Sequence, residues 1–589
     1  MSNNSYRYFG GINMFFSSLS IANFRNFENV KLDLTNKNII FGLNDIGKTN
    51  FLCAIRFLLD REFRKNGLVD TDFFNRKIDK EISITLKINI DGKEDDDNKK
   101  IYSYMKGAIS SEVKEIYIQL IASYGNEALR AESELFWGSD INNLEAIPSN
   151  QSLYELDRLF NVVYIDSSIQ LDNVFKRYTR EMFRSNTSID EKERTKLNRI
   201  INSLNNSVSN LHNIKEFEQE LVEEYKNFRK EEEIDISIRS EIELNNLYSK
   251  LTPYICNENS DIYPTAGDGR GKILAYTLLT LENRRIEQKK INIFLIEELE
   301  NHLHRSMQIA LSYQIFSDDI FKYLFMTTHS SLIVSQMDNV NLIKLYKEKK
   351  IIAKSHCYKV PPEYIHLKQK LNQNLAEAIY ADTVLLVEGP SEKILFERIL
   401  KEKCEKYESF GGYILEVEGI NFKEYYEVLK KLGIKIIIKT DNDLKLNKNK
   451  RECNLLGLNR GLSLIKSRKV PNIKSVDIDK FEKDTLYKKS IQADIYDAKY
   501  KHECENLEKK YIYLSRIDLE NDLYEAIPDI MDNLVQQESK TKKAVDFLQE
   551  AKMINMIELC KILDKKYCNI IYNHKLFLCI KELVNSCCQ

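Results

Sequence analysis

Apolar and polar positions along this 589-residue chain follow two different patterns. Short apolar runs that alternate with helical periodicity fill residues 14 to about 165, 262–345 and 380–589, and they predict strands alternating with helices. Residues from about 170 to 255 are instead rich in Asn, Glu, Lys and Arg, with apolar residues at helical spacing. The pattern predicts a multidomain α/β protein with a helical insertion, since the chain is too long for a single hydrophobic core.

Individual elements follow from the same pattern. The clearest strands are predicted at Ser18–Ile21, Val30–Leu34, Asn38–Phe41, Glu81–Ile90, Thr383–Val387, Tyr413–Val417 and Ile434–Lys439, with a helix at Asn50–Leu59. In the insertion, apolar residues at helical spacing predict long amphipathic helices; they include Ile201, Leu204, Val208 and Leu211. The insertion is either a solvated helical segment or a helical arm for dimerisation, and the pattern leaves both open.

Composition narrows the class of protein. Apolar residues make up 43% and charged residues 30%, which is typical of a soluble globular protein. The net charge of −2 argues against a protein that coats nucleic acid, but it leaves room for a local basic channel. We see no membrane-spanning run, no signal peptide and no CxxC pair among the eleven cysteines, so we predict a cytoplasmic protein with reduced thiols. Residues 1–13 lack any pattern and are interpreted as an extension or tag.

One turn between a strand and a helix carries a phosphate-binding motif. Residues Gly42–Thr49 read GLNDIGKT, which matches GxxxxGK[ST] in the strand-to-helix context that the motif requires. Lys48 is predicted to reach the β- and γ-phosphates and the Thr49 hydroxyl to hold Mg²⁺, while backbone N–H groups and the helix N-terminus face phosphate oxygens. The nucleotide-binding residues predicted here are Gly42, Asn44, Asp45, Ile46, Gly47, Lys48, Thr49 and Asn50.

Two later strands end in polar residues suited to the same nucleotide. Ile291–Ile296 is an apolar run that delivers Glu297 to the Mg²⁺ shell and Glu298 to the attacking water, as a Walker B strand does. A second apolar run ends at His329, which we interpret as a sensor of the γ-phosphate. Taken alone, these residues are typical of an acidic turn and an ordinary loop histidine. The phosphate-binding motif at Gly42–Thr49, known as a P-loop, favours the functional interpretation.

This order of motifs resembles the ABC-type ATPases of the RecF, Rad50 and SMC group. In that family the P-loop of one head meets a signature motif of a second head. The matching position here is Thr265–Arg270 (TAGDGR), with Gly267, Asp268 and Gly269 as predicted nucleotide contacts. It departs from the common Leu-Ser-Gly-Gly form, which puts efficient ATP hydrolysis in doubt and leaves nucleotide sensing as an alternative. Asn23–Phe27 also resembles the family's early arginine-bearing strand end.

Acidic residues gather after three strands of the C-terminal half. Glu388 and Glu392 follow the strand Thr383–Val387, and Asp441 and Asp443 form a DxD after the strand Ile434–Lys439. The third cluster is Ile517–Leu523 (IDLENDL). Grouped carboxylates repel one another unless a cation neutralises them, and hard oxygen ligands select Mg²⁺ or Mn²⁺. Two such ions about 3.5–4 Å apart can clamp the attacking and leaving oxygens of a phosphodiester.

A glutamate after one strand and a DxD after a later strand resemble the Toprim domain. Individually, the DxD is as common in plain turns and the GxSE start in helix caps. A P-loop ABC head followed by Toprim resembles the OLD-family nucleases, and within them the nuclease subunits of Gabija anti-phage systems, over nearly the whole chain from Met14. The residues that carry this likeness are Asn23–Phe27, Gly42–Asn50, Thr265–Arg270, Glu297–Ser306, Glu388–Lys393, Thr440–Leu444 and Asp518–Tyr524.

The resemblance implies a site and a domain organisation. It adds Asp522 to Glu388, Glu392, Asp441 and Asp443 as a catalytic metal ligand, adds Glu520 as a further ligand, and implies that Lys552 stabilises charge on the phosphate. It divides the chain into the extension 1–13, a first ABC ATPase segment at 14–170, a helical dimerisation insertion at 171–255, a second ABC ATPase segment at 256–375 and a Toprim nuclease domain at 376–589.

The function implied is a nucleotide-regulated, divalent-metal-dependent endonuclease that acts on double-stranded DNA in bacterial anti-phage defence. The cofactors would be Mg²⁺ or Mn²⁺ at the nuclease site and ATP with Mg²⁺ at the head. The partners would be a UvrD-like helicase subunit and further copies of the chain in a homo-oligomer. The alternative is an ATP-switched RecF-like repair clamp with a non-catalytic Toprim module. Basic residues beyond the DxD either track the DNA backbone or form a solvated loop: Lys445, Lys448, Lys450 and Arg451.

Overall fold

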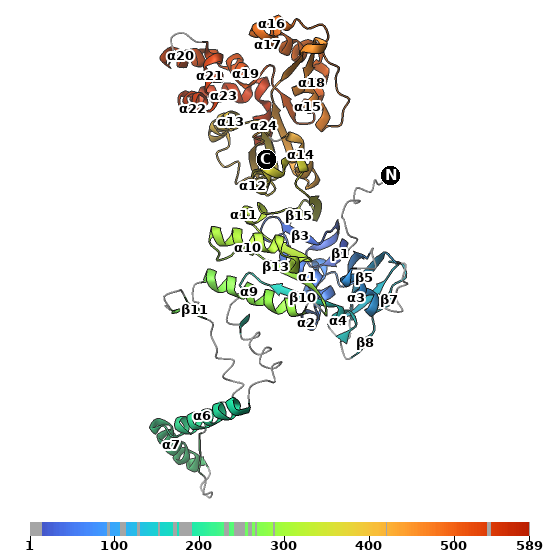
Figure 1. Cartoon of the computed structure of the whole chain (residues 1–589), viewed down its shortest axis with the longest axis vertical. Coiled ribbons are helices and arrows are strands. Elements are labelled where there is room, and N and C mark those ends of the chain that lie inside the picture. Colours follow the sequence, from blue (N-terminus) through green and yellow to red (C-terminus); the bar gives the residue numbers. More distant parts are fainter. Residues whose placement is uncertain are drawn as a thin grey trace.

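The structure of the protein is a computed structural model (Figure 1). It describes residues 14–90, 95–105, 113–125, 130–150, 153–168, 174–175, 191–228, 235–238, 240, 254–256, 262–264, 268–286, 289–419, 421–538 and 543–587. No helix in these ranges is long and apolar enough to cross a membrane. Cys53 and Cys453 are free thiols, whereas Cys404 is disulfide-bonded, so the prediction of fully reduced cysteines was wrong at that residue.

A six-stranded sheet forms the centre of the N-terminal half. Its strand order is β10-β13-β14-β3-β15-β16, in which the first five strands are parallel and β16 is an antiparallel edge strand. The strands are β3 (Lys37–Phe41), β10 (Phe160–Ile165), β13 (Ile291–Glu297), β14 (Leu324–Thr327), β15 (Val340–Lys347) and β16 (Ile351–Tyr358). β13 and β14 are buried along their whole length, which explains why they read as continuous apolar runs.

A second six-stranded sheet is antiparallel and has the order β2-β1-β4-β5-β6-β7. It consists of β1 (Phe15–Phe24), β2 (Phe27–Asp33), β4 (Ile82–Asn89), β5 (Glu115–Gly125), β6 (Arg130–Gly138) and β7 (Glu145–Ala146). Helix α1 (Lys48–Leu59) buries Phe51, Leu52 and Ile55 in a core to which both sheets contribute. The strands and the helix predicted for this region are confirmed.

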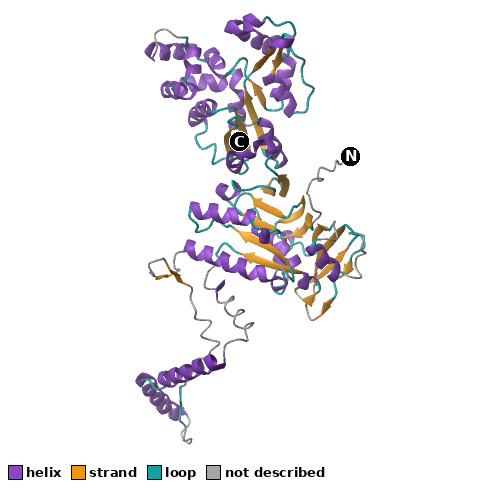
Figure 2. Cartoon of the chain, in the orientation of Figure 1, coloured by secondary structure: helices purple, strands orange, loops and turns teal. Residues whose placement is uncertain are grey.

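Two helices of the insertion stand apart from the sheets (Figures 1 and 2). They are α6 (Glu191–Ser209) and α7 (His212–Phe228), and they confirm the predicted helical character. Ile201 is buried, whereas Leu204 and Leu211 are about half exposed. The boundary predicted at residue 170 lies outside the described residues, and the division into domains stays a prediction.

The C-terminal half contains a four-stranded parallel sheet of order β18-β17-β19-β22. The strands are β17 (Thr383–Val387), β18 (Gly412–Glu416), β19 (Lys435–Thr440) and β22 (Ile512–Leu514). The helices that matter for the site are α13 (Pro390–Lys403), α14 (Phe422–Lys431), α15 (Leu456–Leu464), α19 (Leu519–Ala526) and α22 (Lys552–Ile562). β17 matches its predicted bounds, and β18 and β19 differ from theirs by one residue.

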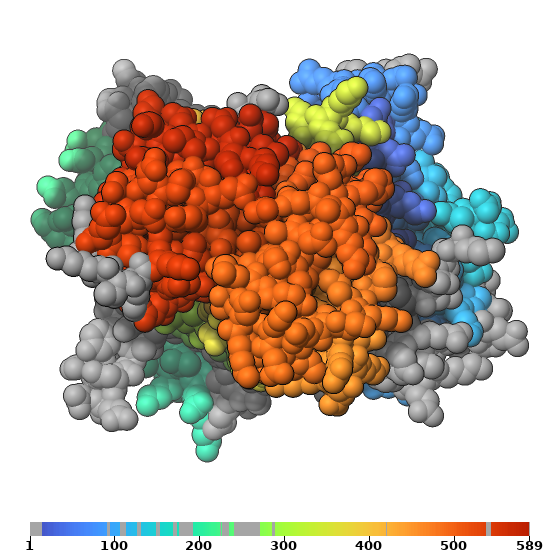
Figure 3. All heavy atoms as spheres, turned by 90° about the horizontal axis from the view of Figure 1, so that it is seen from above, coloured from blue at the N-terminus to red at the C-terminus, as the bar shows by residue number. Residues whose placement is uncertain are grey.

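The two halves share a packed core. One apolar cluster runs from Met326 of β14 through Leu371 of α12 (Lys368–Ala378) to Val384 of β17 and Ile438 of β19. Figure 3 looks onto the C-terminal half, where the orange segment of about residues 450–510 and the red segment beyond it lie side by side. The core therefore joins the predicted nucleotide-binding sheet to the sheet that carries the acidic clusters.

Candidate functional site

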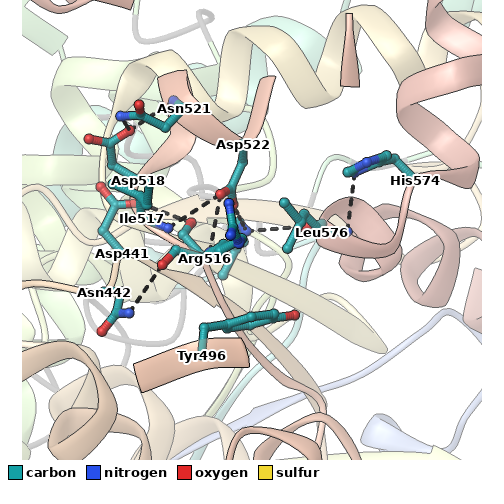
Figure 4. A network of polar contacts seen from close by, with 12 residues as sticks. Asp441, Asn442, Tyr496, Arg516, Ile517, Asp518, Asn521, Asp522, His574 and Leu576 are labelled. Carbon is teal, nitrogen blue, oxygen red and sulfur yellow. Dashed lines mark hydrogen bonds and ion pairs between the residues drawn. The ribbon is translucent and has the colours of Figure 1, made fainter. Parts of the chain in front are cut away.

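The three acidic clusters meet at one edge of the C-terminal sheet. β17, β19 and β22 are adjacent and parallel, so their carboxyl ends lie at the same edge. Glu388 directly follows β17, Asp441 directly follows β19, and Asp518 lies four residues beyond β22 as the N-cap of α19. Figure 4 shows Asp518 next to Asp441. The sequence-predicted clusters are thus brought together, as expected for a site at the carboxyl ends of parallel strands.

Glu388 is held by the residues that end β19. Its Oε1 accepts a hydrogen bond from the Thr440 hydroxyl at 2.7 Å and from the Asp441 backbone N–H at 3.0 Å. Asp441 in turn accepts a hydrogen bond from the Ser515 hydroxyl at 3.1 Å. These contacts fix the first two clusters relative to each other before any ligand is considered.

Arg460 is a further member of the site that sequence analysis missed. Its Nη1 pairs with Glu388 and donates to Thr440 Oγ1 at 2.6 Å, while its Nη2 lies 3.0 Å from Asp443 Oδ2. Arg460 lies on α15, which returns to the site after the hairpin of β20 (Leu444–Asn447) and β21 (Glu452–Leu455). No signal in the sequence joins an arginine 17 residues past the DxD to Glu388.

Burial and mutual repulsion shift the pKa values of the acidic groups upward. Burial, with the charges of Glu388 and Glu520, raises the pKa of Glu392 to about 7. Burial also raises the pKa of Asp441 well above its usual range, and the charges of Glu388, Glu392, Asp518 and Glu520 add to that shift. Five carboxyl groups therefore act on one another at this edge, which is the electrostatic pattern of a site built for cations.

The third cluster divides into two sets of contacts. Glu520 is almost fully buried, and burial together with Asp518 raises its pKa against the charge of Lys552. Asp522 lies on the other side of α19, where its Oδ2 is 3.0 Å from Lys439 Nζ and its Oδ1 accepts the Arg516 backbone N–H at 3.1 Å (Figure 4). Both oxygens of Asp522 thus have partners, and its predicted role as a metal ligand stays a prediction.

Lys552 lies beside the acidic residues, and its predicted role in stabilising phosphate charge stays a prediction. It begins α22, and its Nζ is 3.6 Å from Glu520 Oε1. Burial alone would lower the pKa of Lys552, but the charges of Glu520, Asp441, Glu392 and Asp518 raise it. The lysine therefore stays protonated beside the acidic groups.

The donor set suits a hard divalent cation. Oxygen atoms dominate it, and Oε2 of the buried Glu520 has no hydrogen-bond partner among the described residues. Within those same residues, however, no three acidic, His or Cys side chains already converge as a ready chelate. The chemistry of these donors therefore fits a divalent metal.

The basic residues beyond the DxD lie on the β20–β21 hairpin. Lys445, Lys450 and Arg451 are exposed, and Lys448 is exposed but ion-paired with Glu482. Their contact with DNA stays a prediction.

The P-loop has the geometry of a phosphate-binding turn. Gly42 (φ 152°) and Gly47 (φ 99°) adopt conformations that favour glycine, and a Cβ on Gly47 would meet the Asn26 side chain at 2.1 Å. Lys48 Nζ donates to the carbonyl oxygens of Gly42 and Leu43 at 3.2 and 2.9 Å. Asn26 Nδ2 donates to the Ile46 carbonyl at 2.7 Å, so the early Asn-Phe-Arg-Asn-Phe segment clamps the loop.

The downstream strand ends lie around the same loop. Burial raises the pKa of Glu297, whereas the hydroxyls of Tyr164 and Thr49 lower it, and Glu297 Oε1 has no hydrogen-bond partner among the described residues. His329 Nε2 is 4.0 Å from Glu298 Oε1. Burial, with the charge of Lys48, lowers the pKa of His329.

Only some residues of the signature segment are described. Gly267 lies outside the described residues, while Asp268 and Gly269 lie in the first turn of α9 (Asp268–Ile286). The nucleotide contacts of these three residues stay predictions.

The sequence of the chain matches known families and relatives. Residues 14–155 match the family described as AAA ATPase domain, and residues 379–443 match the TOPRIM domain of proteins like the overcoming lysogenization defect protein. A relative called Endonuclease GajA from Bacillus cereus (strain VD045) is 42% identical over 583 residues, which cover 97% of this chain and 100% of the relative. A second Endonuclease GajA, from Bacillus cereus (strain HuB5-5), is 21% identical over 38% of this chain and 37% of its own length.

Solved structures give weaker likenesses. An SMC head bound to the C-winged helix domain of ScpA has a TM-score of 0.34 at 11% identity, covering 58% of this chain and 98% of the SMC chain. The C-terminal region of the Burkholderia pseudomallei OLD protein has a TM-score of 0.23 at 13% identity, covering 35% of this chain and 98% of that region. These scores are too low to bear on function.

Proposed function

This chain belongs to the family of the GajA endonucleases, and from that premise we propose that it is a divalent-metal-dependent DNA endonuclease under nucleotide control. One observation carries the proposal: the carboxylates of three adjacent strand ends act on one another at a single sheet edge, and Lys552 lies beside them. A module that only bound DNA would have no use for clustered negative charge facing an anionic ligand.

The acidic residues divide the work. Glu388, Glu392, Asp441, Asp443 and Glu520 would hold the metal, with Asp522 as a further ligand. A bound divalent cation supplies Lewis-acid stabilisation of phosphate charge and lowers the pKa of water. Lys552 stays protonated and can donate to a phosphate oxygen, where positive charge stabilises the transition state.

The nucleotide head serves as a brake in this proposal. Lys48, Glu297, Glu298 and His329 surround one loop, which supports nucleotide binding, while the divergent signature favours sensing over rapid hydrolysis. The shared core between the two sheets offers a path by which nucleotide could restrain the cutting site. Falling nucleotide levels would then release cleavage.

The family also supplies the biological setting of the proposal. We place the protein in bacterial anti-phage defence, acting on double-stranded DNA with a UvrD-like helicase partner and as a homo-oligomer formed through the α6–α7 insertion. The two helices of that insertion, with the exposed Leu204 on α6 and the exposed Leu211 between α6 and α7, support an arm that meets another chain.

A supercoiled-plasmid assay tests the activity. The purified full chain is incubated with plasmid in Mg²⁺ or Mn²⁺, with EDTA, and after metal is restored to the EDTA-treated sample. Nicked or linear DNA that forms only with metal supports the nuclease. Persistent DNA binding without cleavage in either metal would instead support the RecF-like clamp and contradict the proposal.

A further inference from the structure

Lys439 and Arg460 both pair with carboxylates at the acidic edge, but their pairs differ in access to solvent. The side chains of Lys439 and Asp522 are only 2% and 1% exposed, so this pair is sealed in the core. The Arg460 side chain is 26% exposed, and its partners Glu388 and Asp443 are 27% and 47% exposed. The Arg460 pairs are therefore more accessible to ions from solvent than the Lys439–Asp522 pair.

Arg460 links the two carboxylates that ought to receive the metal. One nitrogen of its guanidinium contacts Glu388, and the other contacts Asp443 at 3.0 Å. A forked guanidinium satisfies two carboxylates at once, which a single ammonium group does less well. The guanidinium therefore lies between Glu388 and Asp443, and a divalent ion bound to both of them would meet a positive charge within contact distance.

The backbone that carries Arg460 is fixed although its side chain can move. α15 begins against the DxD turn, where the Gly457 N–H donates to the Asp443 carbonyl at 3.1 Å. A Cβ on Gly457 would lie 2.1 Å from the Asp441 carbonyl oxygen, so only glycine permits this approach. The Phe422 ring, 5.7 Å from the guanidinium carbon, lies alongside it. Displacement of Arg460 therefore requires rotation of a partly exposed side chain and no shift of the helix.

We propose that Arg460 is a built-in counter-ion that competes with the divalent metal for Glu388 and Asp443. The inference rests on the proposed nuclease function and deepens it. Before metal binds, Arg460 neutralises the two carboxylates and keeps the site folded. Metal then displaces the guanidinium, so Arg460 sets the metal concentration at which the site fills.

Metal affinity of the full chain tests this role directly. EDTA-treated and dialysed protein is titrated with Mn²⁺ at mildly alkaline pH, and bound Mn²⁺ is measured by electron paramagnetic resonance or calorimetry. Arg460→Gln and Arg460→Met both remove the charge, and Arg460→Met also keeps an apolar stem against Phe422. Arg468→Gln is the matched control, because Arg468 is an exposed arginine shortly after α15.

We expect Mn²⁺ to bind both Arg460 variants on the order of tenfold more tightly than the wild type, because a unit charge in contact with the ligands has been removed. Arg468→Gln should match the wild type. Unchanged or weaker binding in an Arg460 variant that melts cooperatively would overturn the inference, because a purely structural arginine does not oppose metal. If the wild type cuts plasmid and binds Mn²⁺ while the Arg460 variants bind Mn²⁺ no more tightly than the wild type, only the counter-ion role is contradicted. A wild type that neither binds Mn²⁺ nor cuts contradicts the proposed function as well.

Discussion

Glu392 shows at the scale of one residue how the acidic site costs stability. It lies in the first turn of α13 and is 8% exposed, and burial with neighbouring carboxylates raises its pKa to about 7, from a usual 4.5. Below pH 4.5 the carboxyl is protonated in both the folded and the unfolded chain. As the pH rises from 4.5 to 7, the unfolded chain releases this proton before the folded chain does. The free energy of unfolding therefore falls between pH 4.5 and 7 and stays at its lower value above pH 7.

Glu392→Gln should therefore stabilise the metal-free protein at neutral pH. We expect a gain of roughly 2–3 kcal/mol above pH 7 and no gain below pH 4.5, because the amide cannot ionise. Thermal unfolding in EDTA across this pH range measures the effect. Glu397→Gln, at an exposed position on the same helix, should show a much smaller change. An equal gain at pH 4 and pH 8 would contradict the electrostatic explanation.

Lys439 is the buried cation that the sequence pattern offered no reason to suspect. The three residues before it in β19 are isoleucines, yet Nζ contacts Asp522 Oδ2 and the Leu576 carbonyl, each at 3.0 Å. The charge of Asp522 holds the pKa of Lys439 above its usual value although burial opposes it. Removing the lysine would leave a buried aspartate without its partner.

Lys439→Met should lower the free energy of unfolding by about 3–5 kcal/mol, because an uncompensated buried charge remains. Lys435 lies in the same strand as Lys439 and forms a partly exposed pair with Glu582. Lys435→Met should lower the free energy of unfolding by no more than about 1 kcal/mol. Denaturant unfolding compares the two. Equal losses in the free energy of unfolding would show that burial of the Lys439–Asp522 pair does not make it more important for stability.

At the scale of elements, α15 aligns the site. Gly457 allows its first turn to touch the DxD turn, and Arg460 follows one turn later. A Cβ at Gly461 on the same helix would meet only flexible ends of side chains, the closest being Leu507 Cδ1 at 2.9 Å.

Gly457→Ala should therefore reduce cleavage about 100-fold, since it displaces Asp441 and Asp443 by a fraction of an ångström or more. Gly461→Ala should keep most of the activity, because side chains can yield where a backbone carbonyl cannot. Initial rates of plasmid nicking measure both variants. Full activity in Gly457→Ala would show that the close approach of α15 is not needed.

The packing of these elements explains which parts of the site could be predicted from the sequence. Strand ends were predictable because β13 and β17 are buried and mostly apolar, β19 contains three consecutive isoleucines, and acidic residues lie at or directly after the end of each strand. Parallel pairing then determined that Glu388 and Asp441 would meet. Arg460 was not predictable, because it reaches the site through a hairpin whose path depends on tertiary packing. The different surroundings of Glu520 and Asp522 were also hidden, since they depend on which face of α19 packs against Lys439.

At the scale of the whole molecule, one apolar core links the sheet that carries the predicted nucleotide site to the sheet that carries the acidic clusters. If nucleotide restrains cleavage through this core, physiological ATP should slow plasmid nicking by the wild type. Lys48→Ala should remove most of that inhibition, because the lysine is predicted to contact the phosphates. Nicking rates of both proteins over an ATP titration test this prediction. The brake is contradicted if ATP does not change the nicking rate of the wild type and Lys48→Ala does not change that rate either.

The central claim is that the acidic edge of the C-terminal sheet cuts DNA, and one matched pair of variants tests it most directly. Asp441→Asn removes a coupled carboxylate, whereas Asp382→Asn changes an exposed aspartate at the opposite end of β17. Nicking of supercoiled plasmid is measured at saturating Mn²⁺ for both variants. The account predicts at least a ~100-fold loss of activity in Asp441→Asn and near wild-type activity in Asp382→Asn. Undiminished nicking by a well-folded Asp441→Asn protein would contradict it.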